Sequence, residues 1–114
     1  MPFLKITTNQ TLDDTTRATL LGEASARVAE ALGKPERYVM VELADGRPML
    51  FAGDDAPLAY LELKSIGLPE GATPALSDAL CDLVGERLGI PADRVYIEFS
   101  NAARHLWGWN GTTF

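Results

Sequence analysis

Hydrophobic and polar residues alternate along several short segments of this 114-residue chain, a pattern typical of β-strands. In the segment VMVEL, Val39, Val41 and Leu43 share one face of an extended backbone, because successive side chains of a strand point to opposite sides. Two later segments alternate in the same way, whereas the apolar segment at the start of the chain leaves its register open. The pattern predicts strands at residues 3–8, 39–43, 58–65 and 95–99.

Apolar residues at helical spacing predict one helix after the first strand and another after the third. The first runs from a cap at Thr11 or Asp13 to about residue 32, where Gly33 supplies a left-handed stop. The second begins with Thr73 as its cap and Pro74 at the first helical position. The expected apolar stripes are Leu21, Val28 and Leu32 in the first helix, and Leu76, Leu80, Leu83, Val84 and Leu88 in the second.

The chain contains an internal repeat. Residues 27–43, RVAEALGKPERYVMVEL, align without a gap on residues 83–99, LVGERLGIPADRVYIEF. Both segments read as the end of a helix, a glycine, a proline and a strand, so we expect a single domain, 1–114, made of two β-α-β repeats at about 1–56 and 57–114. A helical crossover favours parallel pairing. The predicted fold is therefore α/β (α+β), with a four-stranded mixed sheet and both helices on one face.

The second face of the predicted sheet is too polar for a dry core and rather rich in Tyr and Met for plain solvent. It carries Met40, Glu42, Tyr60, Glu62, Lys64, Tyr96 and Glu98. A symmetric oligomer that covers part of this face is the expected solution. Residues 49–51 and 106–109 are expected to add short strands that connect neighbouring subunits.

Composition narrows the possible partners. The chain is 46% hydrophobic and 23% charged with a net charge of −6 and no run of Lys or Arg, so neither nucleic acid nor a membrane is an expected partner. The start lacks a secretory leader pattern, and no apolar stretch approaches the roughly 20 residues of a membrane helix.

Cysteine and histidine limit the possible chemistry. The only cysteine, Cys81, excludes an internal disulfide and dithiol exchange; we expect it to be a buried, inert thiol in a cytoplasmic protein. The only histidine, His105, is expected at the surface. One His and one Cys cannot build a zinc site or a Ser–His–Asp triad, and no metal or other cofactor is expected.

Pro2 has two interpretations. Proline lacks the backbone N–H that a strand ladder uses, so it suits the first position of a strand. If Met1 is removed, however, Pro2 carries a secondary amine at the N-terminus. An α-amino group titrates near about 8 in water, and an apolar pocket would lower that pKa toward neutrality.

These features together resemble the tautomerase superfamily, and within it the family of macrophage migration inhibitory factor and D-dopachrome tautomerase. The resemblance covers nearly the whole chain and rests on MPFLKITTN, LGKPERYV, LKSIG, ALCDLVGERLGIPADRVYIEF and WGWNGTTF. It implies a homotrimer with sheets around a solvent channel and active sites between subunits. It also implies a cofactor-independent keto–enol tautomerase for aromatic α-keto acids such as phenylpyruvate, with the Pro2 amine as general base after removal of Met1.

The resemblance also implies further site residues. Lys34 matches the lysine that holds the substrate carboxylate, Ile66 a residue that lines the pocket, and Tyr96 a tyrosine contributed across the subunit interface. Without the resemblance, Lys34 is a solvated lysine near a helix end, and Ile66 and Tyr96 are packing residues. The aromatic positions around the pocket mouth are matched by Tyr38, Trp109 and Phe114, which equally suit a core or an interface.

The sequence departs from the family pattern at several positions. Glu98 replaces a pocket asparagine, Trp107 replaces a smaller aliphatic residue and narrows the entrance, and residues 58–61 lack a CxxC motif. Three roles are open for Glu98. An ionised carboxylate near Pro2 would raise the pKa of the Pro2 amine, and a protonated carboxyl would donate a hydrogen bond to the substrate. A Glu98 side chain that points into solvent would have no catalytic role. Two other functions stay open: a cytokine-like trimeric binding protein with a vestigial site, and a related superfamily enzyme that uses Glu98 with Arg94.

Overall fold

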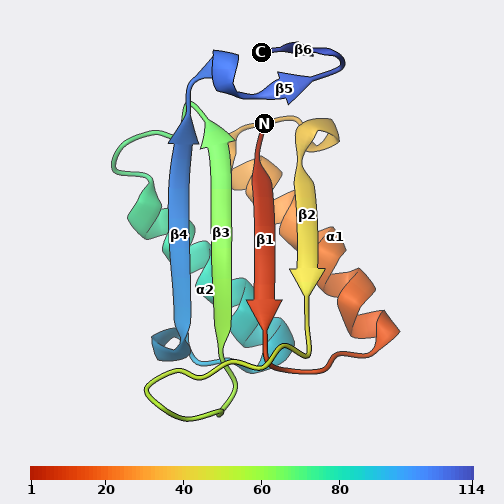
Figure 1. Ribbon diagram of the computed structural model, residues 1–114, viewed down its shortest axis with the longest axis vertical. Coiled ribbons are helices and arrows are strands. Elements are labelled where there is room, and N and C mark those ends of the chain that lie inside the picture. The colour runs from red at the N-terminus through yellow and green to blue at the C-terminus, as the bar shows by residue number, and fades with distance from the viewer.

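The computed structural model describes residues 1–114 as a four-stranded sheet with two helices across one face (Figure 1). The strands of the sheet are β1 (Phe3–Thr8), β2 (Met40–Ala44), β3 (Ala59–Ile66) and β4 (Val95–Ala102). The helices are α1 (Asp14–Leu32) and α2 (Thr73–Leu88). The remaining elements are the short 3-10 turns η1 (Glu36–Tyr38), η2 (Ala92–Arg94) and η3 (Arg104–Leu106), and a C-terminal hairpin of β5 (Gly108–Trp109) and β6 (Thr112–Thr113).

The sheet has the strand order β2-β1-β3-β4. β1 runs parallel to β2, and β3 runs parallel to β4, as expected for strands joined by a helical crossover. The central pair, β1 with β3, is antiparallel. The predicted fold, a mixed sheet with both helices on one face, is confirmed.

The core lies between the sheet and the helices, and it fixes the register that the sequence left open for β1. Leu4 and Ile6 are fully buried on the helix side, whereas Phe3 and Lys5 lie on the open side. The buried cluster consists of Leu4, Ile6, Leu20, Ala24, Val28, Ala59, Leu61, Leu63, Leu76, Leu80, Leu83, Val84 and Ile90. The apolar stripe predicted for the second helix is therefore part of this core.

The stripe predicted for the first helix is partly wrong. Leu20 is fully buried in the core, whereas the predicted Leu21 is only half-buried and does not pack against the cluster. Leu20, Ala24 and Val28 follow one another at intervals of four residues and therefore share one face of α1. Neither α1 nor α2 is long and apolar enough to cross a membrane.

The start of the second helix also differs from the prediction. Ala72 occupies the cap position without a side-chain hydrogen bond, and Thr73 is already helical. Pro74 lies in the first turn, where the backbone N–H groups have no partner within the helix, so its missing N–H costs nothing. The Ala72 carbonyl accepts the Leu76 N–H at 3.0 Å.

Cys81, further along α2, is half-buried rather than buried. Burial raises the pKa of its thiol, which therefore stays protonated at neutral pH.

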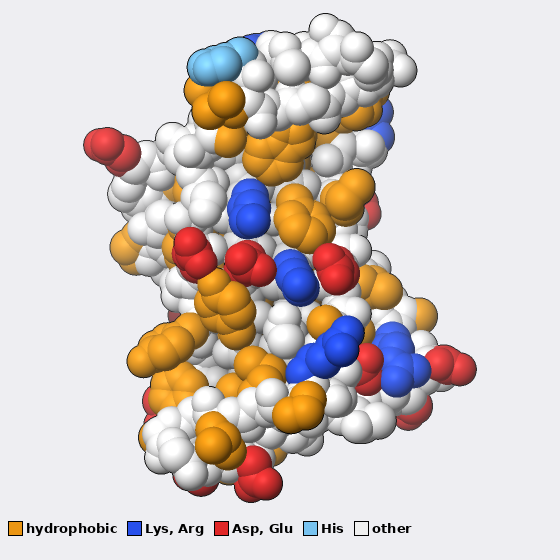
Figure 2. All heavy atoms as spheres, viewed as in Figure 1, with side chains coloured by type: hydrophobic (Ala, Val, Ile, Leu, Met, Phe, Trp, Pro, Cys, Tyr) orange, Lys and Arg blue, Asp and Glu red, His pale blue; other side chains and the backbone are white.

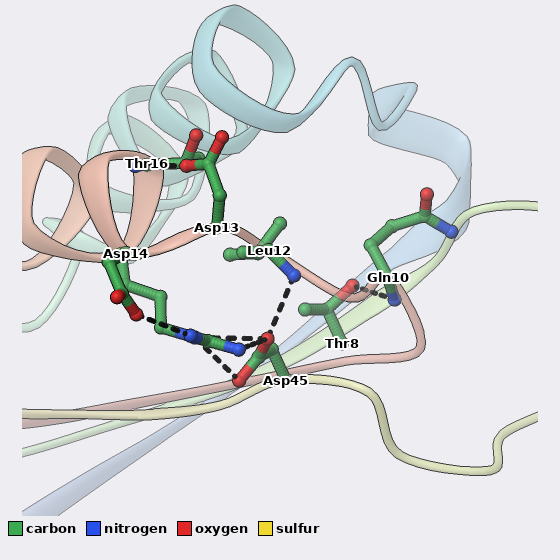
Figure 3. Close-up of polar contacts among 8 residues, drawn as sticks. Thr8, Gln10, Leu12, Asp13, Asp14, Thr16 and Asp45 are labelled. Carbon is green, nitrogen blue, oxygen red and sulfur yellow. Dashed lines mark hydrogen bonds and ion pairs between the residues drawn. The ribbon is translucent and has the colours of Figure 1, made fainter.

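A polar contact joins the start of α1 to the end of β2 (Figure 3). The Asp45 carboxylate accepts the Leu12 N–H at 2.9 Å and an Arg17 N–H at 3.0 Å. The hydrogen bonds from Arg17 and then from the Leu12 backbone lower the pKa of Asp45. Asp13 caps α1, as one of the two predicted alternatives, by accepting the Thr16 N–H at 2.7 Å. These bonds fix the direction in which α1 leaves the sheet.

The two adjacent leucines of α1 allow a matched test of the observed core. Leu20→Ala is expected to lower the free energy of unfolding by about 2–5 kcal/mol, because a fully buried leucine leaves a cavity. Leu21→Ala makes the same chemical change on the same helix and is expected to cost clearly less. Urea denaturation of both variants at one protein concentration measures the difference. Equal losses would contradict the placement of Leu20 in the core.

Candidate functional site

A small cavity of about 230 Å³ lies at the end of the sheet where β1 begins. Residues 1–3, residues 37–40, residues 107–109 and Phe114 line it. In Figure 1 the N-terminus, the start of β2 and the C-terminal hairpin meet at this end. Segments from the beginning, the middle and the end of the sequence therefore form one site.

Pro2 is held in this cavity by the first strand pair. Its side chain is almost completely buried, and its carbonyl accepts the Met40 N–H at 3.0 Å. The parallel register then places Phe3 opposite Met40. Because Pro2 precedes β1, its missing N–H removes no bond from the sheet.

Aromatic side chains cover the cavity. The ring centroids of Tyr38 and Trp109 are 5.4 Å apart and those of Tyr38 and Phe114 are 6.1 Å apart, both edge to face, while Trp109 and Phe114 stack at 5.5 Å. Asn110 and Gly111 connect β5 to β6 with positive φ at both residues, the geometry of a tight hairpin turn. The predicted strand at 106–109 is thus a shorter strand, β5, that pairs within its own chain, and the Asn-Gly dipeptide was the signal for it.

The electrostatic environment of the cavity favours a neutral amine. Burial and then the positive charge of Lys34 lower the pKa of the Met1 amino group. Lys34 follows the left-handed Gly33, and its backbone N–H donates to the Ala29 carbonyl at 2.9 Å. No Asp or Glu side chain lines the cavity to oppose this effect.

Four predicted site residues lie outside the cavity lining: Lys34, which is close enough to the N-terminal amine to lower its pKa, and Ile66, Tyr96 and Glu98. Ile66 ends β3 at the same end of the sheet as Pro2 but is buried. Tyr96 lies at the opposite end, 68% exposed, with its ring centroid 4.8 Å from that of Phe51. Glu98 lies on the open face and accepts a hydrogen bond from the Tyr60 hydroxyl at 2.5 Å. Within one chain, Tyr96 and Glu98 are therefore apart from Pro2, whereas Tyr38, Trp107, Trp109 and Phe114 are beside it.

Charged side chains form a row across the open face, and Figure 2 shows this band across the middle of the molecule. The strand registers pair Glu42 with Lys5, Lys5 with Glu62, and Glu62 with Glu98. The hydrogen bond to Glu98, followed by burial and the negative charges of Glu98 and Glu62, raises the pKa of Tyr60 to about 12. Glu98 is thus a hydrogen-bond acceptor inside an acidic row.

Arg94 holds the loop between β2 and β3. Its guanidinium donates to the backbone carbonyls of Phe51, Asp54, Ala56 and Pro57. Each of the three guanidinium nitrogens of Arg94 therefore has at least one partner in this loop, and Nη2 also pairs with the Asp54 carboxylate at 3.0 Å. Within one chain, residues 49–51 form no strand beyond a single bridge that joins Phe51 to Asp54. Pairing of this segment with a neighbouring subunit stays a prediction.

Sequence reasoning missed one charged residue of the cavity. Arg37 lines it, with its guanidinium carbon 4.8 Å from the centroid of the Tyr38 ring. The available signal was its position beside Tyr38 in the LGKPERYV segment. His105 is exposed, as predicted, and no group of three His, Cys, Asp or Glu residues is arranged to hold a metal ion.

Comparisons with known proteins agree over the full length of the chain. The sequence model of the family described as macrophage migration inhibitory factor matches residues 1–114. A macrophage migration inhibitory factor homolog from Brugia malayi is 38% identical over 115 residues, covering 100% of this chain and 99% of that protein. The crystal structure of a homologue from Prochlorococcus marinus superimposes with a TM-score of 0.92 and 44% identity over 98% of both chains. The structure of Leishmania major MIF2 gives a TM-score of 0.87 and 36% identity, covering 100% of this chain and 97% of that one. The chain therefore belongs to the macrophage migration inhibitory factor family.

Proposed function

We propose that the protein is a cofactor-independent keto–enol tautomerase of aromatic α-keto acids, with the Pro2 amine as general base. The main support for the proposal is the position of Pro2, which is buried in an aromatic-lined cavity. The amino group of Met1, at the same place, has a lowered pKa. Removal of Met1 would transfer the free amine to Pro2 in the same surroundings. An amine with a pKa near neutrality is suited to remove a proton from carbon.

The proposed reaction moves one proton. The neutral Pro2 nitrogen removes a proton from the carbon next to the keto group, and the electron pair moves onto the carbonyl oxygen. The protonated amine then delivers the proton to that oxygen and gives the enol. Lys34 pairs with the substrate carboxylate, while Tyr38, Trp107, Trp109 and Phe114 enclose the aryl group and exclude water.

We further propose that a second copy of the chain completes the site in a homotrimer. Tyr96 lies at the opposite end of the sheet from Pro2 and is exposed with an apolar environment beside it, and Glu98 lies in the charged row across the middle of the open face. A head-to-tail contact in a cyclic assembly would bring them to the Pro2 cavity of a neighbour. Ile66, at the Pro2 end of β3, would line the inner wall of that shared site.

Substitution of Pro2 tests the base. Pro2→Ala keeps a terminal amine after Met1 removal but loses the ring, so phenylpyruvate tautomerisation is expected to fall about a hundredfold or more. An ultraviolet assay gives the rate, intact mass establishes whether Met1 is removed, and circular dichroism establishes folding. Full activity in protein that retains Met1 would disprove the assignment.

The alternative function is a cytokine-like binding protein. It predicts receptor binding that Pro2→Ala leaves intact, and no keto-acid turnover in the parent protein or in Pro2→Ala.

Mixing two inactive variants tests the shared site. Pro2→Ala and Tyr96→Ala are each expected to lose activity, but subunits mixed one to one and reassembled should regain about a quarter of the parent activity, because a quarter of the sites combine an intact Pro2 with an intact Tyr96. Each variant unfolded and reassembled alone is the control. If the mixture stays as inactive as its components, Pro2 and Tyr96 do not act in one site between copies.

We also propose that Glu98 functions as the hydrogen-bond acceptor that holds the Tyr60 hydroxyl. A nearby negative charge stabilises the protonated phenol, so Glu98→Gln is expected to lower the pKa of Tyr60 from about 12 toward 10. Ultraviolet difference titration against Tyr60→Phe isolates this hydroxyl. Glu42→Gln removes the same charge from β2, at the far side of the charged row, and should leave Tyr60 nearly unchanged. An unaltered Tyr60 titration in Glu98→Gln would contradict the pair.

A further inference from the structure

Two cations flank the Pro2 cavity, and neither has an anionic partner in the chain. Lys34 is near enough to the N-terminal amine to lower its pKa, and Arg37 lines the cavity directly. Neither residue takes part in an ion pair or donates a side-chain hydrogen bond, whereas Arg17, Arg27, Arg87 and Arg94 all pair with carboxylates. Lys5, Arg47, Lys64 and Arg104 also lack an ion pair, but none of them lines the cavity.

Arg37 is exposed and lies against the aromatic wall of the cavity. It belongs to the η1 turn, immediately before β2, and its guanidinium carbon lies 4.8 Å from the centroid of the Tyr38 ring. Stacking on an aromatic ring leaves the edge of the guanidinium free to donate hydrogen bonds in its own plane. Arg37 is therefore presented at the aromatic wall with its donors unused.

We propose that Arg37 is a specificity-determining residue that selects substrates with a second anionic group. This inference rests on the proposed function, in which Lys34 holds the carboxylate next to the keto group. The favoured substrate class is then an aryl α-keto acid with a further carboxylate on the ring, which Arg37 binds through two parallel hydrogen bonds. A cavity of about 230 Å³ is smaller than the roughly 300–1,000 Å³ of pockets for drug-sized ligands, which suits a single ring.

The test compares two substrates that differ by one carboxylate, phenylpyruvate and 4-carboxyphenylpyruvate. The parent protein is expected to have the higher kcat/KM for the dicarboxylate. In Arg37→Gln, the ratio of the two kcat/KM values is expected to fall about tenfold, mainly because KM for the dicarboxylate rises. Arg37→Lys should retain part of the preference. Arg27→Gln, on the helix side of the sheet, removes the same charge and should leave the ratio unchanged.

A binding measurement separates this inference from the tautomerase proposal. The only two tryptophans, Trp107 and Trp109, both line the cavity, so intrinsic fluorescence reports on this site alone. Phenylacetate and 4-carboxyphenylacetate lack the keto group and serve as probes. The parent should bind the dicarboxylate more tightly, and Arg37→Gln should remove the difference, even if no keto acid is turned over.

Two outcomes would overturn the role of Arg37. Equal affinity of the parent for both acids would show that Arg37 does not recognise a second anion. An unchanged substrate ratio in Arg37→Gln, with a melting temperature that falls equally in Arg37→Gln and Glu98→Gln, would assign Arg37 to an ion pair with a carboxylate of a second copy.

Discussion

β1 pairs with a parallel strand on one side and an antiparallel strand on the other, and the candidate site depends on this double pairing. The parallel pairing with β2 brings the start of β1 beside the turn that carries Arg37 and Tyr38. The antiparallel pairing with β3 brings the same point beside the end of β3 and, through β4, beside the C-terminal hairpin (Figure 1). Pro2 lies where these three segments meet, so its position follows from the hydrogen bonds of the whole sheet rather than from its own contacts.

Contacts within the chain hold the cover of the cavity together. The Asn110–Gly111 turn fixes the hairpin, and the three contacts among Tyr38, Trp109 and Phe114 each contribute about 0.5–1.5 kcal/mol beyond their buried area. The Phe114 N–H also donates to the Trp107 carbonyl at 3.1 Å. Because these rings already contact one another within the chain, we expect binding to restrict little further side-chain motion. A rigid cover is therefore compatible with selection by the shape and charge of the substrate.

The sequence predicted those parts of the fold in which polar residues mark one face. Alternation identified the faces of β2, β3 and β4, but Phe3 and Leu4 make both faces of β1 apolar, and only the surrounding sheet decides between them. Leu20 and Leu21 are equally apolar, and only packing against the sheet, which Leu20 shares with Ala24 and Val28, decides which one is buried. Pro2 and the aromatic residues were found through the family resemblance. Arg37 was not, because its importance arises from tertiary proximity to Pro2 and from the absence of a partner.

The charged row on the open face limits how copies of the chain can associate. The row itself holds three carboxylates, Glu42, Glu62 and Glu98, and one cation, Lys5, and burying such a group would cost several kcal/mol for each ion left without a partner. The middle of the face must therefore stay in contact with water in any assembly. The exposed apolar side chains lie at its two ends, Met40 beside the Pro2 cavity and Tyr96 beside the loop that Arg94 holds. The charge distribution therefore favours the two ends of this face, where Pro2 and Tyr96 lie, over its middle for the contacts of the proposed assembly.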